Sequence, residues 1–179
     1  MDMPTLSFVL RAALILALLP VLFVGASLAW NHPPLLDTPG IGARLKTYLT
    51  THVAETREKH PFPELRPRTF AVPPALLLSF GAQVLPQLGW PLSSQQPDPH
   101  TLRAVATTLL WRFKDDITLR IDAAPEGGSI LYVRSESRVG KGDLGANVRR
   151  VIDVTEEIAR HVMAHEQAEK EKKRLPKPA

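Results

Sequence analysis

The sequence predicts an α+β domain of two layers behind one membrane-directed helix. Three observations support this fold class: an apolar run near the N-terminus, alternation of apolar and polar residues in the second half, and a long amphipathic pattern at helical spacing after it. The expected order is β-α-β-β-β-α. The sheet should be mainly antiparallel, because a Glu126-Gly127-Gly128 turn links the last two strands. The 179 residues allow one domain of ordinary size.

An uncharged apolar run covers residues 12–30, directly after Arg11. It has about the 20 residues that a helix needs to cross a hydrocarbon core, and it shows no polar face. A retained transmembrane anchor is the favoured interpretation, because the run is longer than the apolar core of a usual signal peptide. A cleaved signal is the alternative, since Ser27-Leu28-Ala29 offers small residues at a cleavage position.

Prolines interrupt regular structure over residues 31–74, except in the interval 42–59. Apolar residues recur at helical spacing in that interval, which predicts a juxtamembrane amphipathic helix. This helix would either pack on the following domain or lie on the bilayer surface. The expected organisation is an anchor over 1–30, a linker over 31–65, the α+β domain over 66–167 and a charged tail over 168–179. The tail would be solvated or would contact phosphate or lipid headgroups.

Within the domain, four strands are expected at 68–72, 101–113, 117–122 and 129–139. The helix between the first two opens at Pro73 and Pro74, where proline is favourable because its missing N–H would have no partner. Alternation predicts one buried sheet face, formed by Ile117, Leu119, Ile121, Leu131, Val133 and Val139. The last helix would cover that face with Val148, Val151, Ile152, Ile158, Val162 and Met163.

Three stretches carry a specific resemblance: HPFPELRPRTFAVPP, AVATTLLWRFKDDITLRI and ILYVRSESRVGKGDLGANVRR. They contain the patterns H-x-x-x-x-L-R-P-R, T-T-x-x-x-R-F-K-D-D and R-S-x-S-R-V-G-x-x-D-L-G-x-N. Over residues 60–162 the chain resembles the bacterial domain-of-unknown-function fourteen-ninety-nine family. The resemblance implies a membrane-associated or exported domain with no assigned reaction. The Asn-Cys-Val-Ser-Ser segment of many members is absent from this cysteine-free sequence.

A glycine-rich stretch, 140–145, satisfies G-x-G-x-x-G between a strand and a helix. It is not interpreted as a dinucleotide site, because no second parallel strand with a ribose-binding acid is expected after the helix. The glycines are instead assigned to a tight turn and Asp143 to a helix cap. An anion site at this corner, helped by Arg138 and Lys141, is the alternative.

Charged residues gather at strand ends and on the polar sheet face. Cross-strand charge pairs are favoured there over a catalytic pair at Asp115 and Asp116, because adjacent strand residues point to opposite faces. The candidates for interaction or anion binding are Arg112, Lys114, Arg120, Tyr132, Arg134, Arg138, Lys141 and Asp143.

No catalytic, metal or cofactor site is predicted. Without cysteine the chain lacks a thiol nucleophile, a thiolate metal site and an acylated-cysteine anchor. His161 and His165 share a helix face with Glu157, which suits a metal site but equally a solvated face. A formal net charge of +4 and few aromatic residues on the polar face disfavour nucleic acid as a partner.

The predicted function is that of a membrane-anchored, non-catalytic interaction domain. It would be an accessory or scaffolding subunit of a larger bacterial membrane complex, with the bulk of the chain on the periplasmic side. Its partners would be the membrane and other subunits of that complex. Binding of a lipid or small anion outside the cytoplasm is the alternative, and an enzyme ranks third.

Overall fold

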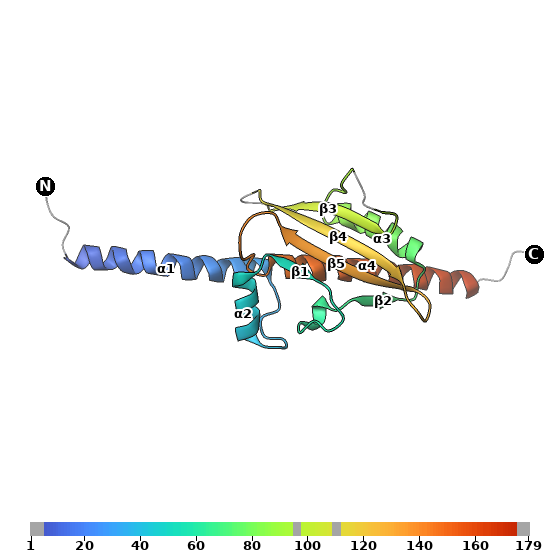
Figure 1. Ribbon diagram of the computed structural model, residues 1–179, viewed down its shortest axis with the longest axis horizontal. Coiled ribbons are helices and arrows are strands. Elements are labelled where there is room, and N and C mark those ends of the chain that lie inside the picture. The colour runs from blue at the N-terminus through green and yellow to red at the C-terminus, as the bar shows by residue number, and fades with distance from the viewer. Residues whose placement is uncertain (1–5, 95–97, 109–111, 175–179) are drawn as a thin grey trace, which may run out of the picture.

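The structure, a computed structural model, describes residues 6–94, 98–108 and 112–174 and has two layers behind a projecting helix (Figure 1). The helices are α1 (Leu6–Asn31), α2 (Ile41–Thr50), the 3-10 turn η1 (Pro63–Leu65), α3 (Pro74–Gln87) and α4 (Ala146–Arg174). The strands are β1 (Val53–Glu55), β2 (Arg68–Phe70), β3 (Thr101–Thr107), β4 (Lys114–Ala123) and β5 (Ser129–Ser137). The predicted α+β class with an antiparallel sheet is confirmed.

The sheet has the order β1-β5-β4-β3, and β2 pairs with another part of β5. All the pairs between these strands are antiparallel. The predicted order β-α-β-β-β-α corresponds to β2 through α4, whereas β1 was not predicted because three residues are too few to show alternation. The strand predicted over 101–113 ends at Thr107, and residues 109–111 lie outside the described part of the chain.

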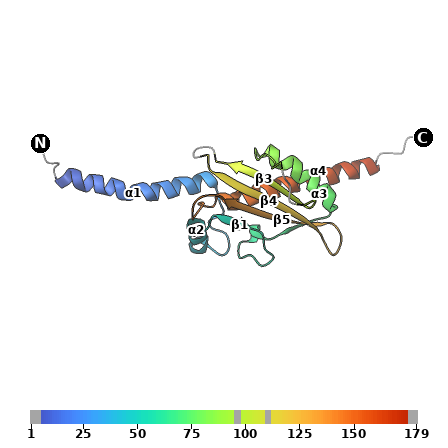
Figure 2. The same cartoon turned by 45° about the horizontal axis from the view of Figure 1, so that its top comes forward.

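Helices α3 and α4 pack on one face of the sheet, as Figures 1 and 2 show. The alternating residues Ile117, Leu119 and Ile121 of β4 and Leu131 and Val133 of β5 are at most 2% exposed under these helices. From α4, Val148, Val151, Ile152, Ile158 and Val162 are buried against them. Each buried side chain of this size stabilises the fold by about 1.5–3 kcal/mol.

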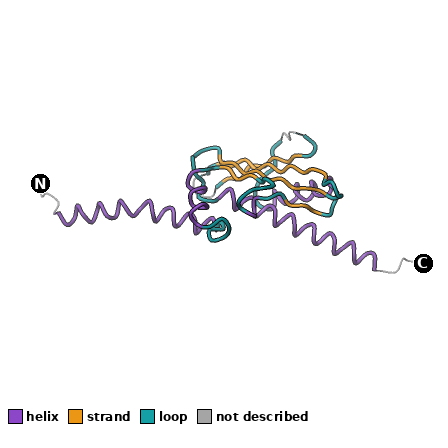
Figure 3. The backbone as a smooth tube through the Cα atoms, turned by 60° about the horizontal axis from the view of Figure 1, so that its bottom comes forward, coloured by secondary structure: helices purple, strands orange, loops and turns teal. Residues whose placement is uncertain are grey.

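Two predicted core residues are not in the core. Val139 is 66% exposed, because β5 ends at Ser137 and the chain then leaves the sheet. Met163 is 51% exposed, because it lies at the margin of the apolar stripe of α4. The helix itself continues to Arg174, through the first part of the segment assigned to a charged tail. It points away from the end of the domain that carries α1 (Figure 3).

The apolar helix α1 stands free of the domain over most of its length. Its segment Phe8–Asn31, 24 residues long, is long and apolar enough to cross a membrane by length and composition. Contact with the domain is confined to the last turn, where Leu28 packs at the edge of the core. There, Asn31 Nδ2 also donates a hydrogen bond to the carbonyl of Leu144, at 3.1 Å.

Much of the segment between α1 and β2 is built into the domain. The predicted juxtamembrane helix is α2, which ends at Thr50 rather than at residue 59, and it packs on the domain through Arg44 and Tyr48. After it, β1 pairs with β5, and Phe62 and Leu65 are buried in the core.

Arg44 of α2 is fully buried and fixes the connection between α1 and the domain. Its guanidinium donates two hydrogen bonds to the Glu64 carboxylate, at 2.5 and 3.1 Å. It also donates to the backbone carbonyls of Pro34, Asp37 and Thr38 in the segment after α1. A buried charge is tolerated only when it is paired and its donors are satisfied, which these contacts achieve.

Replacing Arg44 should therefore destabilise the domain strongly. We expect Arg44→Met to lower the free energy of unfolding by about 3–5 kcal/mol, because it leaves the Glu64 carboxylate and the Thr38 carbonyl without their donor. The carbonyls of Pro34 and Asp37 keep the Tyr48 hydroxyl and the Gly40 N–H as donors. Lys46→Met on the same helix is the control, because Lys46 is exposed. Thermal unfolding of the full chain in detergent measures both variants, and equal midpoints would contradict the role assigned to Arg44.

Candidate functional site

The face of the sheet opposite α3 and α4 is the candidate functional site, because no helix among the described residues covers it (Figure 1). We call it the open face. Its polar residues come from β1, β3, β4 and β5 and include Glu55, Thr101, Arg103, Asp116, Thr118, Arg120, Asp122, Tyr132, Arg134 and Glu136. Three of the predicted candidates, Arg120, Tyr132 and Arg134, thus lie side by side, and Arg138 lies at the edge of the same face.

The centre of the open face is an aromatic contact beside a shallow hollow. Arg120 of β4 and Tyr132 of β5 are paired in register, and the guanidinium lies 4.1 Å from the ring centroid. Arg120 also pairs with Asp122. A hollow of about 170 Å³ adjoins them, lined further by residues that include Thr101, Thr118 and Arg134. Because strands hold these side chains, their positions are fixed before any partner binds.

Arginines and acids form pairs across the open face, as predicted. Arg134 contacts Glu55 of β1 at 3.2 Å and Glu136 at 2.8 Å. Arg138 donates two hydrogen bonds to Asp116, at 2.7 and 2.9 Å, and this guanidinium lowers the pKa of the Asp116 carboxyl. These side chains are 38–50% exposed, so each pair contributes only about 0–1 kcal/mol to stability. The pairs balance the charge of the surface more than they stabilise the fold.

On the opposite side of the same strands, a buried polar network joins the sheet to α4. Asp115 pairs with Arg150 at 2.6 Å, and its side chain is only 3% exposed. Ser135 donates to the Asn147 side chain at 2.5 Å, and Asn147 donates to Ser137 at 2.9 Å. Ser135 and Asn147 are fully buried, so these polar groups are out of reach of a substrate. The network positions α4 on the sheet.

Sequence reasoning missed this network, although it left a signal. Asp115 is in phase with the apolar residues of β4, and Ser135 with those of β5. A polar residue on the apolar face of a strand requires a buried partner. The partners, Asn147 and Arg150, lie on the helix that covers that face, and only the fold brings them into contact.

The glycine-rich corner is structural. Asp143 accepts hydrogen bonds from the backbone N–H groups of Gly145 and Asn147, at 2.8 and 3.1 Å, which confirms the predicted helix cap. Burial raises the pKa of the Asp143 carboxyl. Because this carboxylate already occupies the N–H groups at the start of α4, the corner leaves no free anion site there.

The remaining predicted candidates lie away from the hollow. Arg112, Lys114 and Lys141 are exposed. Lys114 begins β4, Arg112 precedes it, and Lys141 is in the loop after β5. In Figure 1 the start of β4 and the end of β5 lie at the end of the sheet nearest to α1. His161 and His165 both pack beside the ring of Phe80 from α3, with ring centroids 5.9 and 5.8 Å away. Within the described part of the chain, no three metal-ligating side chains come together.

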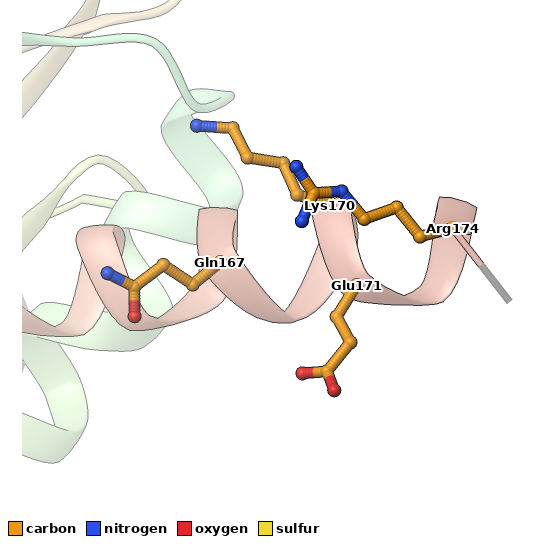
Figure 4. A pocket seen from close by; sticks show the side chains of 4 residues that line it. All are labelled: Gln167, Lys170, Glu171 and Arg174. Atoms are coloured by element: carbon orange, nitrogen blue, oxygen red, sulfur yellow. The ribbon is translucent and has the colours of Figure 1, made fainter.

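A larger hollow, of about 500 Å³, lies beside the last turns of α4. Figure 4 shows its lining residues, Gln167, Lys170, Glu171 and Arg174, on a single helix that projects from the domain. Their side chains diverge instead of converging on one point (Figure 4). It is therefore an open surface of the helix and offers no binding site.

Gly142 shows how closely the glycine-rich corner is packed on α2. A Cβ atom at Gly142 would lie 2.3 Å from the carbonyl oxygen of Leu49. We therefore expect Gly142→Ala to destabilise the domain by about 1–3 kcal/mol, because a backbone atom has to move. Gly42→Ala in α2 is the matched control, since nothing lies within 4 Å of its Cβ position. It should be neutral or stabilising by up to about 1 kcal/mol. Chemical denaturation compares the two, and an unchanged Gly142→Ala variant would contradict this packing.

Residues 46–158 match the family model described as Protein of unknown function (DUF1499). No curated protein matches the sequence. The matched range begins in α2 and includes the sheet, α3 and the first part of α4, and it therefore includes the open face, the glycine-rich corner and the buried network. The chain belongs to the DUF1499 family of proteins of unknown function.

Proposed function

We propose that the protein is a non-catalytic accessory subunit of a bacterial membrane complex, anchored by α1, which binds a protein partner on the open face. The bulk of the chain lies on the periplasmic side in this proposal. The open face carries it: a rigid surface with paired charges and an aromatic residue at its centre, held on a domain whose other sheet face is filled by its own helices.

The composition of the open face favours a protein partner. Tyrosine and arginine are the residues that most often dominate the binding energy of protein interfaces, and Tyr132 lies between Arg120 and Arg134 in the hollow. Because acids accompany these arginines, the surface suits a partner with polar groups of both signs better than a polyanion. The buried polar groups of Asp115, Ser135 and Asn147, by contrast, already bind other residues of the domain.

The hollow is too small for the alternative of lipid or cofactor binding on this face. Its volume of about 170 Å³ is below the roughly 300–1,000 Å³ of typical small-molecule sites. A small anion would have to compete with the carboxylates that the arginines already contact.

The proposed periplasmic placement of the domain rests on the apolar run near the N-terminus and on the positions of the charged residues around it. An apolar run that directly follows a positive charge is favoured to insert with that end on the cytoplasmic side, so that the chain after it is delivered across the membrane. Arg11, in the first turns of α1, directly precedes the uncharged run 12–30, whereas Arg44 and Lys46 follow that run at a greater distance.

Photo-crosslinking in native membranes tests this proposal. A photoreactive residue in place of Thr118, in the hollow, should form an adduct with another protein. The same residue in place of Glu156, exposed on α4, should not. Tyr132→Ala in the first variant should lower the adduct yield severalfold, because truncating a central tyrosine at an interface costs about 2 kcal/mol.

Two results would contradict the proposal. One is an equal yield of adduct from both positions, which would indicate non-specific contact. The other is no protein adduct at Thr118 together with extraction of the chain as a free monomer. An adduct with lipid at Thr118 would instead favour the alternative function.

A further inference from the structure

We infer that the end of the domain next to α1 rests on the lipid surface, so that the folded domain, and not α1 alone, binds the membrane. We call this surface the membrane rim and define it by Trp30, Lys46, Leu49, Val139 and Lys141. The inference rests on the proposed anchoring by α1. It adds a lipid contact that is independent of the open face.

Exposed apolar side chains are concentrated at this end of the domain. From Trp30 onward, the exposed large hydrophobic residues among those described are Trp30, Leu36, Ile41, Leu49, Leu92, Phe113, Val139 and Met163. All except Leu92 and Met163 lie in the segments around the end of α1. Single exposed apolar residues are normal on a soluble surface, whereas a group at one end of a molecule indicates a contact.

The length of α1 sets the depth of the membrane rim. The apolar segment Phe8–Asn31 has 24 residues and is therefore about 36 Å long at 1.5 Å per residue. The hydrocarbon core is about 30 Å thick, and each headgroup region adds about 5–8 Å. Asn31 would thus lie among the headgroups. It donates a hydrogen bond to the carbonyl of Leu144, so the end of the loop that carries Val139 and Lys141 lies at that depth.

Backbone contacts attach α2 to the same loop. The N–H of Leu144 donates to the carbonyl of Tyr48 at 2.9 Å, and the N–H of Asp143 donates to that of Thr51 at 3.2 Å. In Figure 1, α2 runs across the direction of α1, as a helix in the plane of the membrane surface would. Arg44 and Tyr48 are buried against the domain, and Lys46 and Leu49 are exposed on the opposite side of the helix.

The chemistry of the membrane rim suits the boundary between headgroups and acyl chains. Trp30, 76% exposed in the last turn of α1, is of the residue type enriched at that depth. Leu49 and Val139, 47% and 66% exposed, would be buried by the acyl chains. Lys46 and Lys141 beside them would contact anionic headgroups. The partner that fits this surface is an anionic bilayer.

Fluorescence quenching by lipid tests the inference, because the cysteine-free chain gives no background when one cysteine is introduced and labelled. Val139→Cys and Leu49→Cys place a label on the membrane rim at positions that are already exposed. Met163→Cys is the matched control: it is 51% exposed on α4, and 17 residues after Ala146 it lies about 26 Å along that helix. Leu19→Cys within α1 reports the anchor itself.

The labelled full chain is placed in vesicles of phosphatidylcholine and phosphatidylglycerol that contain lipids with a spin-labelled quencher, near the headgroup in one set of vesicles and near the end of the acyl chain in a second set. We expect the headgroup quencher to lower the fluorescence at Val139 and Leu49, the acyl-chain quencher to lower it at Leu19, and neither to lower it at Met163. Quenching at Leu19 without quenching at Val139 and Leu49 would overturn the inference and leave the anchoring intact. No quenching at Leu19 would overturn the anchoring as well. Equal quenching at Met163 would overturn the inference, because the domain would then lie flat on the bilayer.

Discussion

The rest of the molecule depends on the burial of one guanidinium. Arg44 has no contact with water, and it holds Glu64 of η1 and the carbonyls of the segment after α1 at once. A buried charge needs all of these partners, so the cluster forms as a whole or not at all. It thereby converts a proline-rich connection into a rigid one. The direction of α1 relative to the sheet follows from it.

A second set of polar contacts explains the long motif that ends at Asn147. Ser135 and Ser137 bind Asn147, Asp143 caps α4, and the glycine at 142 allows the corner to approach α2. The glycine-rich part of this motif, 140–145, has the spacing of a dinucleotide-binding loop in the sequence. In the structure the polar groups of Ser135, Ser137, Asp143 and Asn147 are hydrogen-bonded within the domain, because a buried serine or asparagine must satisfy its hydrogen bonds internally.

The fold separates two surfaces that the sequence mixes. The open face takes its side chains from alternate positions of β1, β3, β4 and β5, whereas the membrane rim takes them from α1, α2 and the loop after β5. In Figures 1 and 2 the strands run along the long axis of the molecule, away from α1, so the open face extends away from the end of the domain that carries α1. In the proposed orientation this face would point to the side, toward a neighbour in the same membrane.

The apolar helix α1, the α+β class, the order from β2 to α4 and the pairing of charges on the polar face could be predicted from the sequence, because each of these depends on local composition or periodicity. The sequence did not determine β1, the buried position of Asp115 beside Arg150, or the role of Arg44. These depend on segments that are distant in the chain, and a period of two or 3.6 residues carries no information about which segments meet.

Val139 shows the same limit: it keeps the alternation of β5, but the strand ends before it. The tertiary structure brings the loop that follows it to the end of α1, because Leu144 accepts a hydrogen bond from Asn31 of α1 and donates one to Tyr48 of α2, and Asp143 accepts one from the N–H of Asn147 in α4.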